Sequence, residues 1–85
     1  MKHRLIYTRR ALRDIGSLDE VSKKRIGKTL ARYASDPFKY GEKLTDSALG
    51  TFRFRIGDYR VIFDIQGTDI VVLRVGHRRE LYKRT

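Results

Sequence analysis

The chain has 85 residues, with 20 Lys plus Arg against 10 Asp plus Glu, so its formal net charge is +10. This length excludes a chain of several domains. A domain of this size buries only about 60% of its unfolded surface, so its core is thin and leaves little room for an enclosed cleft. The absence of cysteine excludes disulfides, thiol nucleophiles and Cys-ligated zinc. No apolar run approaches the roughly 20 residues that span a bilayer, and the start does not resemble a signal peptide. We therefore expect a single cytoplasmic domain over residues 1–85, with no membrane partner.

The positive charge is spread along the chain among core-forming residues. Hydrophobic residues make up 40% of the sequence and aromatic residues 11%, which argues against disorder. A compact domain with a pI of about 10.4 has the electrostatic character of a protein that binds nucleic acid or the ribosome. The alternatives are a basic surface that is merely solvated and a surface for anionic membranes.

The first half of the chain predicts a strand followed by two helices. Residues 3–7 are apolar-leaning and bounded by polar residues, which is typical of a strand. Thr8 and Asp19 are good N-caps for the two helices. Gly16-Ser17 should end the first helix and Asp36-Pro37 the second. Apolar residues recur at helical spacings in each helix, which predicts two core faces: Ala11, Leu12, Ile15 and Leu18, then Ile26, Leu30, Tyr33 and Ala34.

Four basic residues of the second helix, Lys23, Lys24, Lys28 and Arg32, fall largely away from its apolar face. They have two readings. They either contact ribosomal RNA through phosphates, independently of sequence and sensitively to salt, or form a face that is only solvated.

The second half predicts a loop and three strands. Residues 36–50 contain a proline and turn formers, and from Thr51 the apolar residues alternate. Gly57-Asp58 fits a two-residue type II′ turn. Residues 70–75 are nearly all aliphatic, as in a central strand buried on both faces, and a basic tail follows. The fold class is therefore α+β: an N-terminal helical hairpin packed on a small twisted antiparallel β-sheet in the order β-α-α-β-β-β.

The two-residue turn fixes the register of the predicted hairpin. One face then carries the apolar set Phe52, Phe54, Ile56, Tyr59, Val61 and Phe63. The other face carries Arg53, Arg55 and Arg60, with Arg55 directly opposite Arg60. A like-charge cross-strand pair is destabilising, so either Asp58 or Asp64 neutralises it or an anionic ligand does.

The third strand and the tail add chemistry of the same kind. Arg74 joins the arginine-bearing face if the turn at Gln66–Asp69 has a three-residue loop with a bulge, whereas a two-residue turn places it on the core face. After the strand, Arg78 offers a planar fork for phosphate oxygens, His77 a ring that titrates near neutrality, and Tyr82 a ring for stacking on a base. Singly these residues favour an exposed His and a packed Tyr, but beside the arginines they indicate an RNA site.

Two segments resemble the RelE/ParE superfamily of bacterial and archaeal toxins. They are residues 52–65, with the run Gly-Asp-Tyr-Arg-Val, and residues 72–82, with Arg-Val-Gly-His-Arg-Arg. The helical part fits as well, and the likeness favours the RelE branch. It implies two N-terminal helices on an antiparallel sheet that includes the first strand. It also implies a type II toxin, held inactive by a partner antitoxin, that cleaves messenger RNA in the ribosomal A site without a metal or cofactor. In that reaction the 2′-hydroxyl attacks the adjacent phosphate, leaving a 2′,3′-cyclic phosphate and a 5′-hydroxyl.

The resemblance also implies roles for individual residues. Arg60 matches the arginine of Gly-x-Tyr-Arg that stabilises the scissile phosphate. Arg78 matches an arginine assigned to the leaving group or the transition state. Tyr82 is similar to a C-terminal tyrosine that stacks on a nucleotide, although its spacing from Arg78 varies in the family.

Arg53 and Arg55 stand near two lysines of the best-known branch, one of them a proposed general base. Arginine does not deprotonate, so Arg55 can stabilise negative charge but cannot accept the 2′-hydroxyl proton. His77 is then the candidate base or acid, with Glu80 second. This hypothesis predicts that His77→Ala loses far more cleavage than ribosome or RNA affinity.

Two other functions fit the same sequence. One is a ParE-like inhibitor of DNA gyrase on the same fold, although such members generally lack the complete set of arginines with the C-terminal His and Tyr. The other is a non-catalytic RNA- or DNA-binding module. For the toxin, the expected antitoxin is a protein that offers acidic residues or an amphipathic helix to the basic surface.

Overall fold

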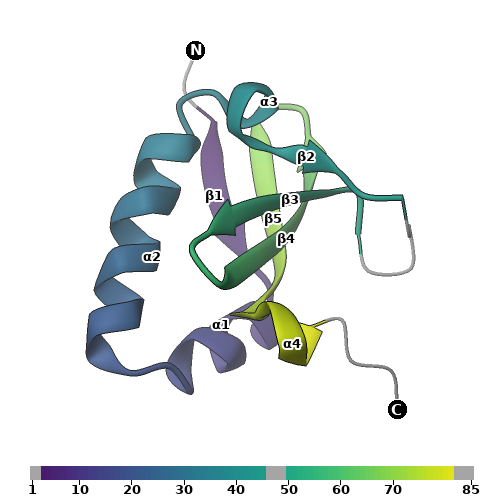
Figure 1. Cartoon of the computed structure of the whole chain (residues 1–85). Coiled ribbons are helices and arrows are strands. Elements are labelled where there is room, and N and C mark those ends of the chain that lie inside the picture. Colours follow the sequence, from purple (N-terminus) through teal and green to yellow (C-terminus); the bar gives the residue numbers. More distant parts are fainter. Residues whose placement is uncertain (1–2, 46–49, 82–85) are drawn as a thin grey trace.

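Five strands form one mixed sheet, and helices cover one of its faces (Figure 1). The computed structural model describes residues 3–45 and 50–81. The elements in chain order are β1 (Arg4–Tyr7), α1 (Arg9–Gly16), α2 (Glu20–Tyr33), α3 (Pro37–Tyr40), β2 (Glu42–Lys43), β3 (Phe52–Ile56), β4 (Tyr59–Gln66), β5 (Asp69–His77) and α4 (Arg78–Leu81). The strands lie in the order β1-β5-β4-β3-β2. In the described ranges, no helix is long and apolar enough to cross a membrane. The predicted α+β class is confirmed.

Both helices begin where the sequence predicts. The side chain of Thr8 accepts a hydrogen bond from the Ala11 amide at 3.1 Å, and the carboxylate of Asp19 accepts one from the Ser22 amide at 3.1 Å. These bonds satisfy amides that have no partner inside the first helical turn. The two caps thus set where α1 and α2 begin.

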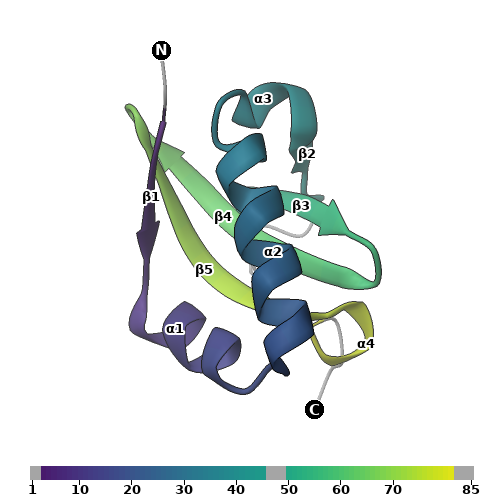
Figure 2. The same ribbon diagram turned by 90° about the vertical axis from the view of Figure 1, so that its left-hand side faces the viewer.

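The core lies between α2 and the sheet, and Figure 2 shows α2 running in front of the strands. Ile26, Leu30 and Ala34 are buried against Phe54 and Phe63, as predicted. The sequence predicts Leu12 on the buried face of α1, but Leu12 is 56% exposed. Consecutive residues lie about 100° apart around a helix, and the short α1 buries only a narrow line through Ala11.

The hairpin register is confirmed. Phe52 faces Phe63, Phe54 faces Val61, and Arg55 faces Arg60. Gly57 has φ +61°, and no non-glycine residue in the described part of the chain has a positive φ, so the turn is type II′ rather than type I′.

Two expectations about the sheet are wrong. The first is that the whole sheet is antiparallel. β1 pairs with β5 in parallel, with Leu5 beside Ile70, and the long connection between them, which contains the helices and three strands, lets β5 run in the same direction as β1. The predicted loop at 36–50 contains α3 and β2. Pro37 ends α2 but also opens α3, since its fixed φ suits a first helical position and Asp36 caps the Lys39 amide.

The third strand also differs from expectation. The fully buried stretch is Arg60–Phe63 in the middle strand β4, whereas β5 buries mainly alternate residues. The Gly67-Thr68 turn has only two residues, yet Arg74 still lies on the face away from α2. The reason is a bulge, because Ile62 faces Arg74 while Phe63 faces Val72. The first part of the predicted tail forms regular structure, because β5 continues to His77 and α4 follows.

Candidate functional site

Four arginines share the sheet face that points away from α2, and we call this the arginine face: Arg53 and Arg55 on β3, Arg60 on β4 and Arg74 on β5. Facing and alternating positions place them there, since side chains alternate between the two sides of a strand. Positive side chains gathered on one side of a sheet favour an anion there.

The predicted like-charge pair is present, and its two members have different environments. Arg60 is only 4% exposed, and its Nη1 donates to the carbonyl oxygens of Gly57 and Tyr59, both at 2.8 Å. The Arg55 side chain is 57% exposed. Arg60 is therefore bound to the turn, while Arg55 is the member of the pair that solvent or a ligand can reach.

Among the described residues, Glu42 is a carboxylate that pairs with two of these arginines, and the sequence placed it in a loop. Glu42 faces Arg53 across β2 and β3, and its Oε1 lies 3.4 Å from Arg53 Nε and 3.9 Å from Arg55 Nε. The expectation that Asp58 or Asp64 neutralises the pair is wrong. Asp64 instead accepts from the Thr51 amide at 2.8 Å. A two-residue strand is too short to show a periodic pattern, so no sequence signal marked Glu42.

Arg74 is committed to a neighbour on α1. Its Nε lies 2.8 Å from Asp14 Oδ2, and the same oxygen accepts from the Val75 amide at 3.0 Å. Asp14 thus satisfies a strand amide beyond the end of β1 and neutralises Arg74. The most exposed cation of the arginine face is consequently Arg55, with the half-buried Arg53 beside it.

His77 lies on the other side of the sheet. It faces Tyr59, a residue of the core face, and the two rings meet edge to face with centroids 5.8 Å apart. The structure therefore does not bring His77 to the arginine face. Arg78 opens α4 with an exposed side chain, and its amide donates to Asp58 at the hairpin turn at 2.9 Å. Tyr82 lies outside the described residues.

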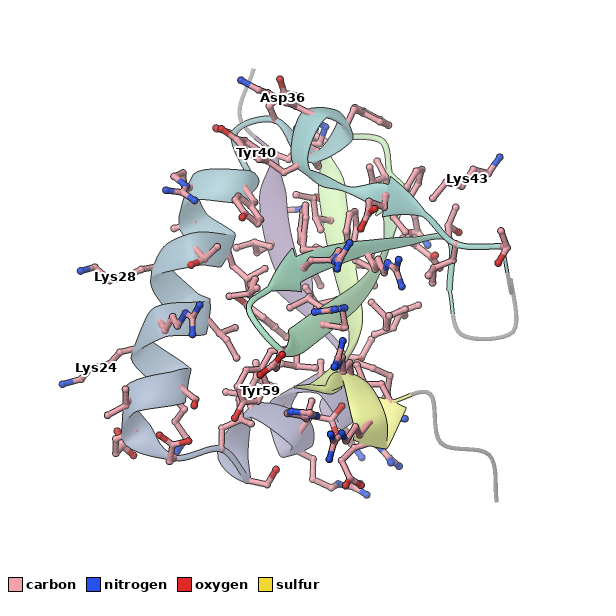
Figure 3. All side chains as sticks on the ribbon, viewed as in Figure 1. Lys24, Lys28, Asp36, Tyr40, Lys43 and Tyr59 are labelled. Carbon is pink, nitrogen blue, oxygen red and sulfur yellow. The ribbon has the colours of Figure 1, made fainter. Side chains whose placement is uncertain are left out.

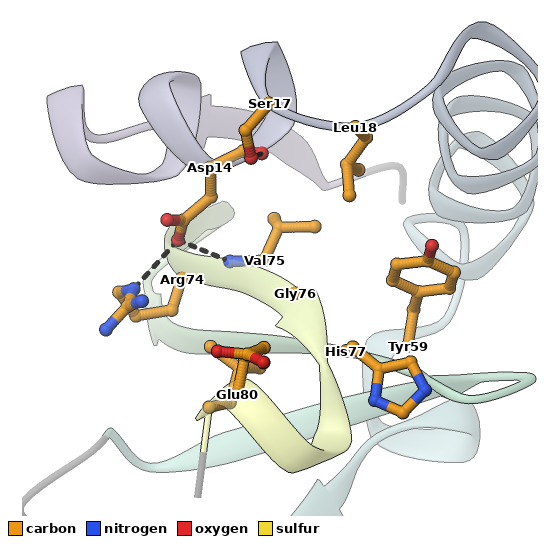
Figure 4. A pocket seen from close by; sticks show the side chains of 10 residues that line it. Asp14, Ser17, Leu18, Tyr59, Arg74, Val75, Gly76, His77 and Glu80 are labelled. Carbon is orange, nitrogen blue, oxygen red and sulfur yellow. Dashed lines mark hydrogen bonds and ion pairs between the residues drawn. The ribbon is translucent and has the colours of Figure 1, made fainter. Parts of the chain in front are cut away.

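A pocket of about 330 Å³ lies where β5 extends past the end of β1, and we call it the edge pocket (Figure 4). Asp14 and Leu18 form the wall on the α1 side, Glu80 the wall on the α4 side, and Tyr59 and His77 one end. The pocket thus gathers both residues that the sequence suggested for proton transfer, His77 and Glu80, away from Arg55.

The basic residues of α2 lie on the opposite side of the sheet from the arginine face. Lys24 and Lys28 are exposed and point away from the sheet (Figure 3), and Arg32 is also exposed, with its guanidinium 5.3 Å from the Tyr33 ring. Lys23 is half-buried and lies 3.4 Å from Glu20. Because α2 covers the core face, this basic helix surface and the arginine face lie on opposite sides of the sheet.

Comparison with known proteins gives the fold and these residues a context. The family described as "ParE toxin of type II toxin-antitoxin system, parDE" matches residues 5–82. The chain belongs to this family. This match confirms the resemblance to the RelE/ParE superfamily of type II toxins that residues 52–65 and 72–82 suggested.

The individual relatives carry RelE-type names. The chain is 39% identical to Toxin RelG of Mycobacterium tuberculosis over 51 residues, which span 58% of this chain and only 59% of RelG. It is 29% identical to a chain of the toxin–antitoxin complex RelBE2 of M. tuberculosis, with a TM-score of 0.82 over 92% of this chain and 100% of that one. E. coli toxin RelE, at 21% identity, shares the fold with a TM-score of 0.73 over 96% of this chain and 92% of its own.

Proposed function

We propose that this chain is a ribosome-dependent endoribonuclease, the toxin of a type II pair, which cleaves messenger RNA in the A site by attack of a 2′-hydroxyl on the adjacent phosphate. The observation that carries the proposal is the exposed Arg55 beside Arg53 and Glu42. A cation and a carboxylate on one open sheet face supply the two things that this reaction needs, charge stabilisation and a proton acceptor.

The proposed chemistry assigns one step to each group. The scissile phosphate lies against Arg53 and Arg55, which stabilise the negative charge that grows on its oxygens. Glu42 accepts the proton of the attacking 2′-hydroxyl as the 2′-O–P bond forms. The P–O5′ bond then breaks, Arg78 stabilises the departing oxygen, and that oxygen takes up a proton to become the 5′-hydroxyl.

Two other residues keep proposed roles. Arg60 fixes the hairpin turn through Nη1 and adds positive charge beneath the face. Because Arg60 is only 4% exposed, the direct contact with phosphate is assigned to Arg53 and Arg55. Tyr82 remains a proposed stacking residue, by resemblance alone.

The proposed partners divide between the two sides of the molecule. The basic helix surface of Lys23, Lys24, Lys28 and Arg32 would hold ribosomal RNA by salt-sensitive phosphate contacts. The arginine face on the far side would then remain open to messenger RNA. An antitoxin partner is supported by the structure of RelBE2, a toxin–antitoxin complex, and the ribosome implies a cytoplasmic location.

One observation favours a second function. The matching family is described as ParE toxin, and by resemblance ParE-like members inhibit DNA gyrase. A gyrase inhibitor on this fold needs a binding surface but no proton acceptor, so it would tolerate the loss of Glu42.

Primer extension on translated messages tests the proposal with wild type, Arg55→Ala and a matched control. The control is Arg13→Ala, which removes the same charge from an exposed position on α1. Wild type and the control should cut at codon positions, whereas Arg55→Ala should cut about 100-fold more slowly, because one charge-stabilising donor is lost. Loss of DNA supercoiling without RNA cuts would establish the gyrase alternative, and RNA binding without either activity would leave a binding module.

A further inference from the structure

The edge pocket lies where β5 has no strand neighbour on one side. Within the described residues, β1 pairs with β5 only as far as Tyr7 and Val72, so residues 73–77 form an open edge. The loop after α1 and helix α4 close the two sides of this edge into a pocket of about 330 Å³. Ligand pockets begin at about 300 Å³, so the edge pocket suits one small planar group rather than a folded segment of protein.

Among the described residues that line the edge pocket, carboxylates outnumber cations. Arg74, the one described arginine there, is paired with Asp14 at 2.8 Å. Glu80 adds a second carboxylate on the opposite wall, and it is exposed. A phosphate therefore fits the arginine face, and the edge pocket favours a neutral group that donates hydrogen bonds to Glu80.

The remaining lining matches the recognition of a nucleobase. His77 Nδ1 accepts from the Arg79 amide at 3.2 Å, so the neutral ring carries its proton on Nε2, which is a donor. Tyr59 contributes an aromatic surface, and Leu18 and Leu81 are apolar. Unstacked bases are bound in this way, by aromatic or apolar contacts on the ring and hydrogen bonds on its edge.

The edge pocket also touches the arginine face. Gly76 lines the pocket and at the same time faces Arg60 across β4 and β5. Neighbouring strands are about 5 Å apart, so the pocket begins one strand from Arg60 and two strands, or about 10 Å, from Arg55. An RNA strand with a phosphate at Arg55 therefore has a flanking base within reach of the pocket.

We propose that the edge pocket binds one base of the RNA next to the cleaved phosphate, and that Glu80 selects bases with an exocyclic amine there. This inference rests on the proposed ribonuclease function. A carboxylate accepts a hydrogen bond from the amine of adenine, cytosine or guanine. At the position of the cytosine amine, uracil carries a carbonyl oxygen, which a carboxylate repels. Glu80 is thus the specificity-determining residue at this position.

Cleavage mapping with Glu80→Gln tests the selection, with Glu20→Gln as the matched control because it makes the same change on α2. A glutamine can also donate, so Glu80→Gln should admit uracil and reduce the discrimination against it by about tenfold, the lower range for one base contact. The control should keep both the base distribution and the cleavage rate of wild type. An unchanged base distribution at an unchanged rate would overturn the inference and leave the ribonuclease function intact.

A binding measurement separates the inference from the ribonuclease function. Wild type is titrated with cytidine and with uridine while the NMR signals of the His77 ring are followed. Cytidine should shift them, uridine should shift them much less, and Glu80→Gln should remove the difference. If wild type makes no cuts, this titration alone tests whether the edge pocket binds a base. The absence of a shift with both nucleosides would then overturn the inference. If Glu80→Gln weakens antitoxin binding while the cytidine response is unchanged, the pocket belongs to the protein partner and the inference is wrong.

Discussion

Replacing Glu42 by glutamine separates the fold from the proposed chemistry. Glu42 is 46% exposed and lies 3.4 Å from Arg53 and 3.9 Å from Arg55, so both ion pairs are screened by water. Such pairs contribute between 0 and about 1 kcal/mol, and glutamine keeps an oxygen for Arg53. We expect Glu42→Gln to lower the free energy of unfolding by about 0.5 kcal/mol, or Tm by about 2–4 °C.

The expected effect on cleavage is much larger. Removing a positioned proton acceptor typically slows a reaction by about 10²- to 10⁴-fold, which corresponds to roughly 3–5 kcal/mol in the activation barrier. His77→Ala should lose less cleavage than Glu42→Gln, contrary to the expectation from sequence, because His77 faces Tyr59 on the other side of the sheet.

The assay combines thermal unfolding with single-turnover cleavage on programmed ribosomes at saturating toxin, so that weaker docking does not affect the rate. Glu20→Gln serves as the control, since its carboxylate lies 3.4 Å from Lys23 and is 80% exposed. Cleavage by Glu42→Gln within threefold of wild type would refute Glu42 as the acceptor. A loss of 100-fold in His77→Ala alone would move proton transfer to the edge pocket.

Two further predictions concern stability. Gly57→Ala and Gly67→Ala both place a side chain at φ near +60°, which costs about 1–2 kcal/mol. In urea unfolding, Gly57→Ala should lose at least as much stability as Gly67→Ala, because its Cβ would lie 2.8 Å from the Arg25 guanidinium while Gly67 faces open space. A smaller loss in Gly57→Ala than in Gly67→Ala would contradict this. Hydrogen bonds from the Ser22 side chain and amide lower the pKa of Asp19, so its stabilising charge is fully present above its unfolded pKa of about 3.9 and is lost as the pH falls through the lower folded value. The stability difference between wild type and Asp19→Asn, which keeps the cap, should therefore shrink below pH 4, and a pH-independent difference would disprove it.

Local rules in the sequence determined much of the fold. The helix starts at Thr8 and Asp19 follow from side chains that cap nearby amides, and the hairpin register follows from a glycine that accepts a positive φ. Each depends on contacts within a few residues of the chain. The opposition of Arg55 and Arg60, and with it the arginine face, could therefore be predicted before any tertiary contact was known.

Tertiary structure decided which groups accompany those arginines. Glu42 reaches Arg53 only because a two-residue strand adds to the edge of β3, and such a strand has no periodicity to detect. Arg74 lies on the arginine face because of a bulge between Ile62 and Phe63, which the length of the preceding turn does not predict. Asp14 from α1 then neutralises Arg74.

His77 is the clearest case of the difference. The sequence places it directly after Gly76, the predicted end of the strand, and next to Arg78, which suggested that both residues fold back to the arginines. In the structure β5 continues through His77. Because side chains alternate along a strand, His77 lies on the helix side, where it lines the edge pocket with Glu80. Charge and register were thus properties of the sequence, whereas the grouping of side chains into two sites depended on strand ends, a bulge and a neighbouring helix, which are long-range contacts.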